Sequence, residues 1–290
     1  MSAGNYSIVF EPETGYSEGL EFTYANSVFE NGAWYVSGVG TCTDTDIIIP
    51  KLTPDGARVT GIGELAFNGC ANITSITVPS GITVIRGAFQ NCSGLTSINL
   101  PGSLVSIGAR AFQKCTSLTS INIPNSVTSI GNSAFSYCTS LTDIKLPASV
   151  SSIDNYAFSN CTSLMSITIP DGVSSIGNYV FSGCTSLTSI TIPDGVTSIG
   201  SYAFSKCTSL TSITIPNGVT SIGDSAFFGC SGLKSITISN SVTSIGNTAF
   251  CNCESLETIT FQGTEEQWNA ITKGAKWDYF NPPYTLIFEN

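Results

Sequence analysis

The sequence repeats itself every 23 residues over most of its length, and this period constrains the fold more than any other feature. The segments CTSLTSITIPDGVTSIGSYAFSK (184–206) and CTSLTSITIPNGVTSIGDSAFFG (207–229) are near copies. Phenylalanine marks one position in each copy, with a step of 23 residues after a first step of 22: Phe67, Phe89, Phe112, Phe135, Phe158, Phe181, Phe204, Phe227 and Phe250. A repeat of this length buries its apolar face only against neighbouring repeats. The chain of 290 residues is therefore predicted to form a solenoid rather than one or two compact domains.

Each copy begins with a short predicted strand. The unit reads L-x-x-I-x-I-P-x-x-V-x-x-I-G-x-x-A-F-x-x-C, and nine copies cover residues 52–262. The part L-x-x-I-x-I is the strand signature of a leucine-rich repeat. In SLTSITIP, Ile190 and Ile192 alternate with Ser189 and Thr191. This alternation predicts a strand with one buried face and one solvated face.

The rest of the unit predicts a turn, a second short extended piece and a little helix. Pro193 is expected to end the strand, because proline has no N–H for a ladder. Gly200, at the end of VTSIG, is expected to adopt a positive φ. The following SYAFSKC predicts one or two turns of helix that direct Ala203, Phe204 and Cys207 inward.

The repeat unit resembles that of the BspA-like leucine-rich repeat proteins, which carry the same SLTSITIPxxVTSIGxxAFxxC wording. The segment Tyr35–Pro50 (YVSGVGTCTDTDIIIP) is similar to the lead-in strands of that family, and Gly263–Ile271 (GTEEQWNAI) to its closing segment. We therefore expect a right-handed, gently curved, β-rich solenoid with a parallel sheet on its concave face and short helical turns on its convex side. Residues 1–51 are expected to form an N-terminal β-type cap, and residues 263–290 a C-terminal cap with a short helix and a strand.

The charge composition disfavours two classes of partner. The chain has 10 Lys and Arg against 20 Asp and Glu, with a net charge of −10. Nucleic-acid binding needs clustered basic residues, and an anionic membrane surface repels an acidic protein. There is no run of 18 apolar residues and no signal peptide pattern at the start. We expect no nucleic-acid partner and no direct membrane insertion.

The sequence contains no recognisable catalytic constellation. Histidine is absent, which excludes Ser–His–Asp and Cys–His nucleophile systems. Asp171 and Asp194 occupy the same turn of adjacent copies, and two carboxylates alone do not make a calcium site. We therefore expect a non-enzymatic protein without a cofactor or metal.

A cysteine follows each repeat phenylalanine by three residues, from Cys70 to Cys253. Three arrangements are open to these cysteines: disulfides between rungs, a metal site, or a column of small buried thiols. Nine cysteines cannot all pair, and no second closely spaced pair accompanies Cys251 and Cys253 to complete a metal site. We predict free, buried repeat thiols, with Cys251 exposed because other copies carry Ser or Gln at its position.

The predicted sheet presents an outward-facing polar surface with one charged rung. The outward pairs are Ser75/Thr77, Ser97/Asn99, Ser120/Asn122, Asp143/Lys145, Ser166/Thr168, Ser189/Thr191, Ser212/Thr214, Ser235/Thr237 and Thr258/Thr260. Asp143 and Lys145 are expected to form an exposed ion pair, and they are the first candidate binding residues.

Tyrosines form the second candidate binding surface. Tyr156, Tyr179 and Tyr202 lie two residues before the phenylalanine in three consecutive copies, and Tyr137 lies at a nearby position of the copy before. Exposed tyrosine is favoured at recognition surfaces because it offers a large area with few rotamers. The other reading is lateral stacking that only stabilises the solenoid.

The family resemblance implies attachment, because similar proteins are surface adhesins of bacteria and protists and attachment-like proteins of viruses. We accordingly expect a monomeric, extracellular or cell-surface binding protein. Its expected partner is a protein or a surface glycan of a host or neighbouring cell. The alternative is a structural spacer or self-assembling subunit, including a viral attachment component.

Overall fold

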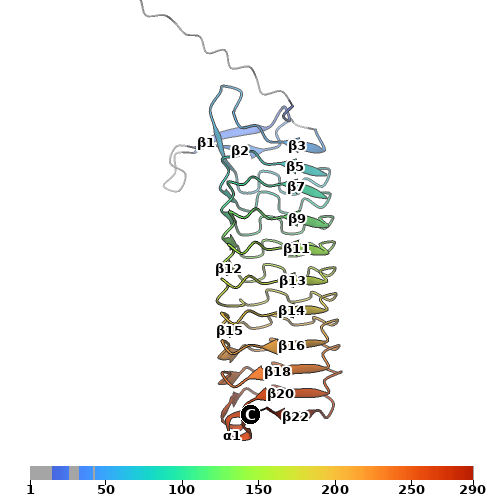
Figure 1. Ribbon diagram of the computed structural model, residues 1–290. Coiled ribbons are helices and arrows are strands. Elements are labelled where there is room, and N and C mark those ends of the chain that lie inside the picture. The colour runs from blue at the N-terminus through green and yellow to red at the C-terminus, as the bar shows by residue number, and fades with distance from the viewer. Residues whose placement is uncertain (1–14, 26–32, 42, 290) are drawn as a thin grey trace, which may run out of the picture.

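The protein is a column of stacked rungs, with each repeat forming one rung (Figure 1). The computed structural model describes residues 15–25, 33–41 and 43–289. The nine copies each place one strand on the same face, which we call the main sheet. Its strands are β5 (Ser75–Thr77), β7 (Ser97–Asn99), β9 (Ser120–Asn122), β11 (Asp143–Lys145), β13 (Ser166–Thr168), β14 (Ser189–Thr191), β16 (Ser212–Ile215), β18 (Ser235–Ser239) and β20 (Thr258–Gln262). Strands pair in parallel with a constant register, as in Ile167 opposite Ile190, within three successive groups: β5 and β7, β9 to β14, and β16 to β20.

The main sheet continues beyond the nine copies at both ends. The strand β3 (Asp46–Ile48) of the lead-in pairs with β5, and β22 (Thr285–Phe288) pairs with β20. From here on, the closing segment means residues 263–289. Both pairings are parallel and keep the register of the repeats. The lead-in and the closing segment therefore each add a rung.

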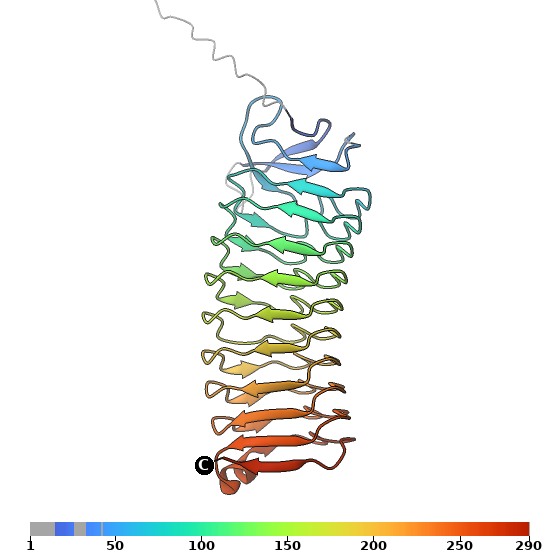
Figure 2. The same cartoon turned by 45° about the vertical axis from the view of Figure 1, so that its right-hand side comes forward.

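A second, narrower ladder runs along the column beside the main sheet, and we call it the side ladder (Figure 2). The VTSIG part of the repeats forms its two-residue strands: β6 (Val84–Ile85), β8 (Ser106–Ile107), β10 (Ser129–Ile130), β12 (Ser152–Ile153), β15 (Ser198–Ile199), β17 (Ser221–Ile222) and β19 (Ser244–Ile245). The closing segment adds β21 (Thr272–Lys273). At the other end, β4 (Val59–Ile62) pairs with β2 (Ala33–Gly38), which is antiparallel to β1 (Glu21–Ala25).

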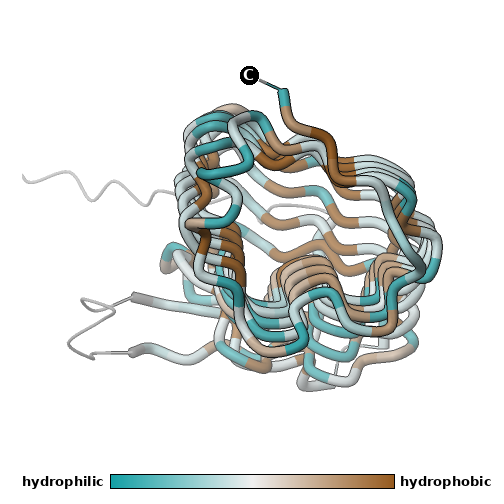
Figure 3. Tube along the Cα trace, turned by 90° about the horizontal axis from the view of Figure 1, so that it is seen from below, coloured by the Kyte–Doolittle hydropathy of each residue, from teal (hydrophilic) through white to brown (hydrophobic). Residues whose placement is uncertain are grey.

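The repeated apolar residues form one continuous core along the column. Viewed along the axis, residues of the same hydropathy lie over one another from rung to rung (Figure 3). The nine phenylalanines form a single column with ring centroids 5.1 to 5.7 Å apart and almost no exposure. Rings at this separation in offset stacks stabilise one another beyond simple burial.

Proline limits the length of the main-sheet strands, as expected. In most copies the strand stops at the third residue, before the proline. Ser239 and Gln262 replace that proline in the last two copies, and there β18 and β20 continue through these residues, which pair with each other. The buried Ser239 hydroxyl donates to the carbonyl oxygen of Pro216 in the preceding copy, at 3.1 Å.

The prediction of a positive φ at Gly200 is wrong. Gly200 does not adopt a positive φ, and neither does its equivalent Gly223 in the next copy. A Cβ on Gly200 would lie 2.6 Å from the carbonyl carbon of Gly177 and 2.7 Å from the backbone nitrogen of Asn178. This glycine recurs because the backbones of successive rungs approach too closely for a side chain.

The side ladder is interrupted at the copy in which this glycine is replaced. The ladder runs to β12 and resumes at β15, with a single bridge between Ile176 and Ile199 joining the copy in between to the later group. The break coincides with Asp154, which occupies the glycine position of the copy that contains β12. β12 itself stays paired with β10, and the Asp154 N–H donates to the Ile130 carbonyl at 2.9 Å, so the break lies between Asp154 and the following copy.

The predicted helical turns are also wrong. The segment around Ala203 and Phe204 is a series of turns, in which N–H groups bonded to the carbonyl three residues earlier alternate with N–H groups bonded to the next rung. Cys207 donates to the Phe204 carbonyl at 3.1 Å, and Lys206 to the Phe228 carbonyl at 2.7 Å. Tyr202 and Lys206 both adopt positive φ within it (57° and 61°), which breaks any helix. In the described part of the chain, α1 (Glu265–Ala270) is the one α-helix, and it lies in the closing segment.

The column runs straight in two views, so the predicted curvature with a concave sheet is not observed (Figures 1 and 2). The turns around the repeat phenylalanines form a further side of the column, which we call the turn side. Backbone hydrogen bonds join these turns from rung to rung, as they join the strands of the main sheet. Phe158, for example, donates to the Val180 carbonyl at 3.0 Å. The predicted handedness and the proposed division into residues 1–51, 52–262 and 263–290 stay predictions.

Candidate binding surface

Tyr156, Tyr179 and Tyr202 form a stacked row on the turn side of the column, and we call it the tyrosine row. Adjacent ring centroids are 4.6 Å apart in both pairs, with interplanar angles of 7° and 6°. The backbone N–H of each tyrosine donates to a carbonyl of the next copy at 2.9 Å, as in Tyr202 to Asp224. The rings therefore project from backbone that is fixed by the rung-to-rung hydrogen bonds.

The row presents ring edges and hydroxyl groups to solvent. Tyr156 is 39% exposed, and Tyr179 and Tyr202 are half-buried because each ring covers its neighbour. Among the hydrogen bonds of the described residues, none involves these three hydroxyls. Desolvation, together with the neighbouring Tyr156 and Tyr202, raises the pKa of Tyr179. The Tyr179 hydroxyl is therefore a neutral donor and acceptor at physiological pH.

The backbone conformation under the row belongs to the repeat rather than to the tyrosines. All three adopt positive φ, between 57° and 60°, and so do Ser133 and Ser225 at the same position of other copies. A side chain in this conformation costs roughly 1–2 kcal/mol. Because serine also adopts the positive φ at this position, the fold does not require an aromatic ring there. The rings are extra exposed side chains in three copies.

Tyr137 does not join the tyrosine row. It lies two residues after its phenylalanine rather than two before, at the second positive-φ position of the repeat (62°). The side chain is exposed, and in the described residues no ring contact joins it to Tyr156. The sequence prediction placed Tyr137 near the row, and the structure gives it a separate place among Lys114 and Asn160, its equivalents in adjacent copies.

Asp143 and Lys145 lie on β11 with exposed side chains, as predicted for the outward face. They flank the buried Ile144 and stand beside Ser120 and Asn122 of the preceding rung. The expected ion pair between them is not formed: the part of the chain that the structure describes shows no salt bridge at this rung. Side chains two residues apart on a strand stand side by side, and both charges remain in water. The rung is a charged interruption of a hydroxyl and amide surface.

The repeat cysteines form a column of free thiols, as predicted. In the described residues all cysteines are free. The Sγ–H groups of Cys92, Cys115, Cys138, Cys161, Cys184, Cys207, Cys230 and Cys253 each donate to the phenylalanine carbonyl of the preceding rung, at 3.0 to 3.3 Å. Burial raises the pKa of these thiols, in Cys184 to about 12. They are core residues and not nucleophiles.

The prediction of an exposed Cys251 is wrong, because this side chain is only 4% exposed. The closing segment passes over this position: the Asn252 N–H donates to the Tyr279 carbonyl at 3.0 Å, on the rung that follows. Of the described cysteines, Cys70 in the first copy is the half-buried one. Cys42 lies outside the described residues.

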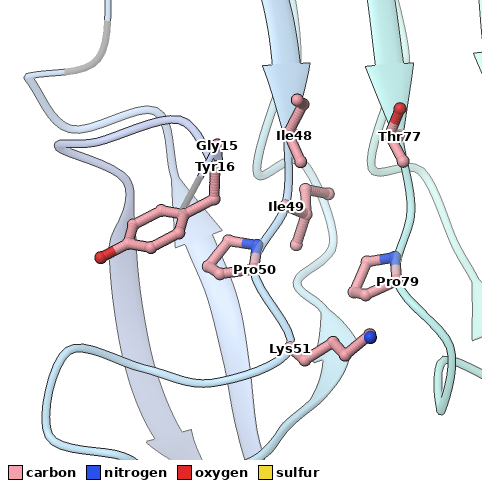
Figure 4. Close-up of a pocket in the computed structure, with 8 residues that line it drawn as sticks. All are labelled: Gly15, Tyr16, Ile48, Ile49, Pro50, Lys51, Thr77 and Pro79. Carbon is pink, nitrogen blue, oxygen red and sulfur yellow. The ribbon is translucent and has the colours of Figure 1, made fainter. Parts of the chain in front are cut away.

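No group of three or more His, Cys, Asp or Glu side chains that would hold a metal ion occurs in the described ranges. Asp171 and Asp194 are exposed turn residues. A hollow of about 390 Å³ lies at the N-terminal end of the column, between Tyr16, Ile49, Pro50 and Pro79 (Figure 4). Its lining is mainly apolar and brings no catalytic group together.

The closing segment contains a degenerate tenth copy that the repeat pattern of the sequence does not predict. Gly274 occupies the close-approach glycine position, and a Cβ there would lie 2.4 Å from the Asn247 nitrogen. Trp277 takes the alanine position, where its carbonyl accepts from Phe250, and its ring meets the Phe250 ring edge-on at 6.1 Å. The signal is visible when TKGAKWDYFN (272–281) is aligned with SIGSYAFSKC (198–207), but the preceding insertion of α1 obscures it.

The comparison with protein families decides the family. Residues 60–188 and 151–272 match the family described as BspA type leucine rich repeat region, with six copies. The chain belongs to this family. Among curated proteins there is no significant match to this BspA-type chain.

Two solved structures support the same assignment. A leucine-rich repeat protein from Bacteroides ovatus shares 30% identity and a TM-score of 0.64, over 93% of this chain and 77% of that one. A leucine-rich repeat protein from T. pallidum shares 30% identity and a TM-score of 0.59, over 66% of this chain and 88% of that one. Both are similar in fold and in repeat sequence. In the described residues of this BspA-type chain, no helix is long and apolar enough to cross a membrane.

Proposed function

We propose that this BspA-type chain is a non-enzymatic binding protein that attaches to a partner on another cell or surface, and that it acts outside the cell. The observation that carries the proposal is the tyrosine row. Three copies carry an aromatic ring where the fold accepts serine, and these rings protrude in register from a rigid backbone. Aromatic side chains on a rigid surface are typical anchors of recognition.

The stacking of the row favours a protein partner over a glycan. A sugar ring binds an aromatic residue through its face, and both faces of Tyr179 are covered by neighbouring rings at 4.6 Å. A protein surface can instead accept the ring edges and pair its polar groups with the three hydroxyls. The outer faces of Tyr156 and Tyr202 are the two places left for sugar stacking.

The charged rung is the competing surface. Asp143 and Lys145 provide two unpaired charges among outward pairs that are otherwise Ser, Thr or Asn in the nine copies, but they bring little apolar area. Exposed charges mainly affect association rates and contribute little affinity. We therefore place the binding energy in the tyrosine row and expect the charged rung to contribute little.

The proposal is tested with two variants that borrow residues from neighbouring copies. The first changes Tyr156, Tyr179 and Tyr202 to Ser, as in Ser133 and Ser225. The second changes Asp143→Ser and Lys145→Thr, as in Ser166 and Thr168. Wild type and variants are applied to immobilised purified extracellular-matrix proteins and to a glycan array. We expect wild type and the charge variant to bind the same spots and the tyrosine variant to lose them. Binding by none of the three would contradict the proposed function.

A further inference from the structure

The two ends of the main sheet differ in whether their outer strand edge is paired. At the N-terminal end, Ser17 covers the outer edge of β3. Its N–H donates to the Ile48 carbonyl at 3.0 Å, and its hydroxyl accepts from the Ile48 N–H at 3.1 Å. The same hydroxyl donates to the Asp46 carbonyl at 3.3 Å. The edge of β3 is therefore closed to another strand.

The outer edge of β22 at the other end is open (Figure 1). The N–H groups of Thr285 and Glu289 donate inward, to the carbonyls of Glu257 and Phe261 at 2.8 and 2.9 Å. Because backbone groups alternate along a strand, those of Leu286 and Phe288 point outward. No described residue pairs with them. An unpaired edge of this kind is a template for another strand.

Apolar side chains surround this open edge. Leu286, Phe288, Tyr284 and Trp277 pack against the end of the core and remain half-buried, because no further rung covers them. Ile287 points to the outer face and is 42% exposed. Exposed apolar groups beside unpaired backbone favour a strand that also brings apolar side chains.

We infer that β22 pairs with β22 of a second copy of this chain, antiparallel and about a twofold axis through Ile287. In this register Leu286 of one copy exchanges both backbone hydrogen bonds with Phe288 of the other, and the reverse pair does the same. Glu289 of one copy then lies opposite Thr285 of the other. The two Glu289 side chains do not face each other, so no like charges are paired. Head-to-tail growth is blocked because Ser17 closes β3, and the product is a closed dimer.

The dimer goes beyond the proposed attachment function and does not depend on it. Joined at the ends that carry β22, two columns would present two tyrosine rows on one particle. Two linked sites raise apparent affinity without any new contact to the partner. The monomer expected from the sequence stays a prediction, and the dimer is the alternative that the experiment below distinguishes from it.

Sedimentation equilibrium tests the pairing, with matched charge variants. Wild type is expected to approach twice the chain mass of 30.3 kDa as concentration rises. Ile287→Lys places two like charges opposite each other at the twofold axis and is expected to remain at the chain mass. Val105→Lys is the control, because Val105 is 44% exposed on the side of the column, and it is expected to dimerise like wild type. Wild type at the chain mass throughout, or assembly beyond a dimer, would overturn the inference.

Cross-linking tests the register. The Cα atoms of facing residues in a non-hydrogen-bonded antiparallel pair lie about 4.5 Å apart, within the range of a disulfide. Ile287→Cys is therefore expected to form a disulfide-linked dimer on mild oxidation, and Val105→Cys is not. Equal cross-linking of both variants, or none with Ile287→Cys, would contradict pairing at β22.

Discussion

The Sγ–H of Cys184 donates a hydrogen bond of 3.2 Å to the backbone carbonyl of Phe158, two residues on successive rungs. The same bond recurs from copy to copy, so each thiol is a second donor to a carbonyl that already accepts a backbone N–H within its own copy, as Phe158 does from Cys161. Ring and thiol thus couple every repeat to its neighbour, and this coupling explains why both residues keep their spacing through the array.

Phe158→Ala is expected to destabilise the protein by about 3–5 kcal/mol, because it removes a fully buried ring from the middle of the column. Its ring lies 5.5 Å from Phe135 and 5.7 Å from Phe181, and both lose a contact. Urea unfolding measures the change. A midpoint equal to that of wild type would show that the column does not stabilise the stack.

Gly200→Ala is expected to cost roughly 1–3 kcal/mol, because the new methyl group would overlap the backbone of the preceding rung at Gly177 and Asn178. Gly102→Ala is the control, since a Cβ there meets nothing within 4 Å and its φ is not positive. Thermal unfolding midpoints of the two variants separate the effect of close backbone approach at Gly200 from the general effect of replacing a glycine by alanine. Equal midpoints would contradict close approach at Gly200.

Asp154→Gly is expected to raise stability by about 0.5–1 kcal/mol, the net contribution of a recovered backbone hydrogen bond. The change removes the side chain that coincides with the break between β12 and β15. Hydrogen exchange at Gly177 provides the structural readout. Unchanged exchange and unchanged stability would show that Asp154 does not cause the break in the side ladder.

The thiols are expected to make stability fall at alkaline pH. Burial raises the pKa of Cys184 from 9.0 to about 12, so the folded state favours the neutral thiol. The stabilisation is complete below the pKa of the unfolded thiol and is lost as pH rises from about 9 toward 12. Urea midpoints measured across this range provide the test, with Cys161, Cys184 and Cys207 changed to Ala as control. An equal loss in the control would assign the effect to other groups.

Thiol counting checks the same column independently. Denatured protein is expected to react at close to all 11 cysteines. Among the described cysteines, native protein is expected to react first at the half-buried Cys70 and not at Cys251. Mass spectrometry of the labelled peptides identifies the site. Disulfides between successive repeat cysteines would contradict the free-thiol column.

The sequence predicts the core and the strands well because their signal is periodic. Ile190 and Ile192 are buried and Ser189 and Thr191 are not, as the alternation requires. The errors concern features that depend on contacts between rungs. Nothing local in VTSIG shows that the backbone of Asn178 lies against Gly200, and nothing in CNC shows that Tyr279 passes beside Cys251.

The turn side was mispredicted for a related reason. The residues of SYAFSKC are compatible with helix, and only the rung-to-rung hydrogen bonds select the positive φ at Tyr202 and Lys206. The tyrosine row itself was visible in the sequence, since the 23-residue step places the three rings in register. The sequence does not predict that the rings stack, so that Tyr179 is covered on both faces and only ring edges and hydroxyls reach solvent.

Hydroxyl-radical footprinting of the protein bound to a captured partner tests the account most directly, because it locates the contact without mutation. Met165 is an internal reference: it is 54% exposed and precedes β13 at the main sheet. We predict that the partner protects Tyr156, Tyr179 and Tyr202 and leaves Met165 as reactive as in the free protein. Protection of Met165 with unchanged tyrosines would contradict the account and move the binding surface to the main sheet.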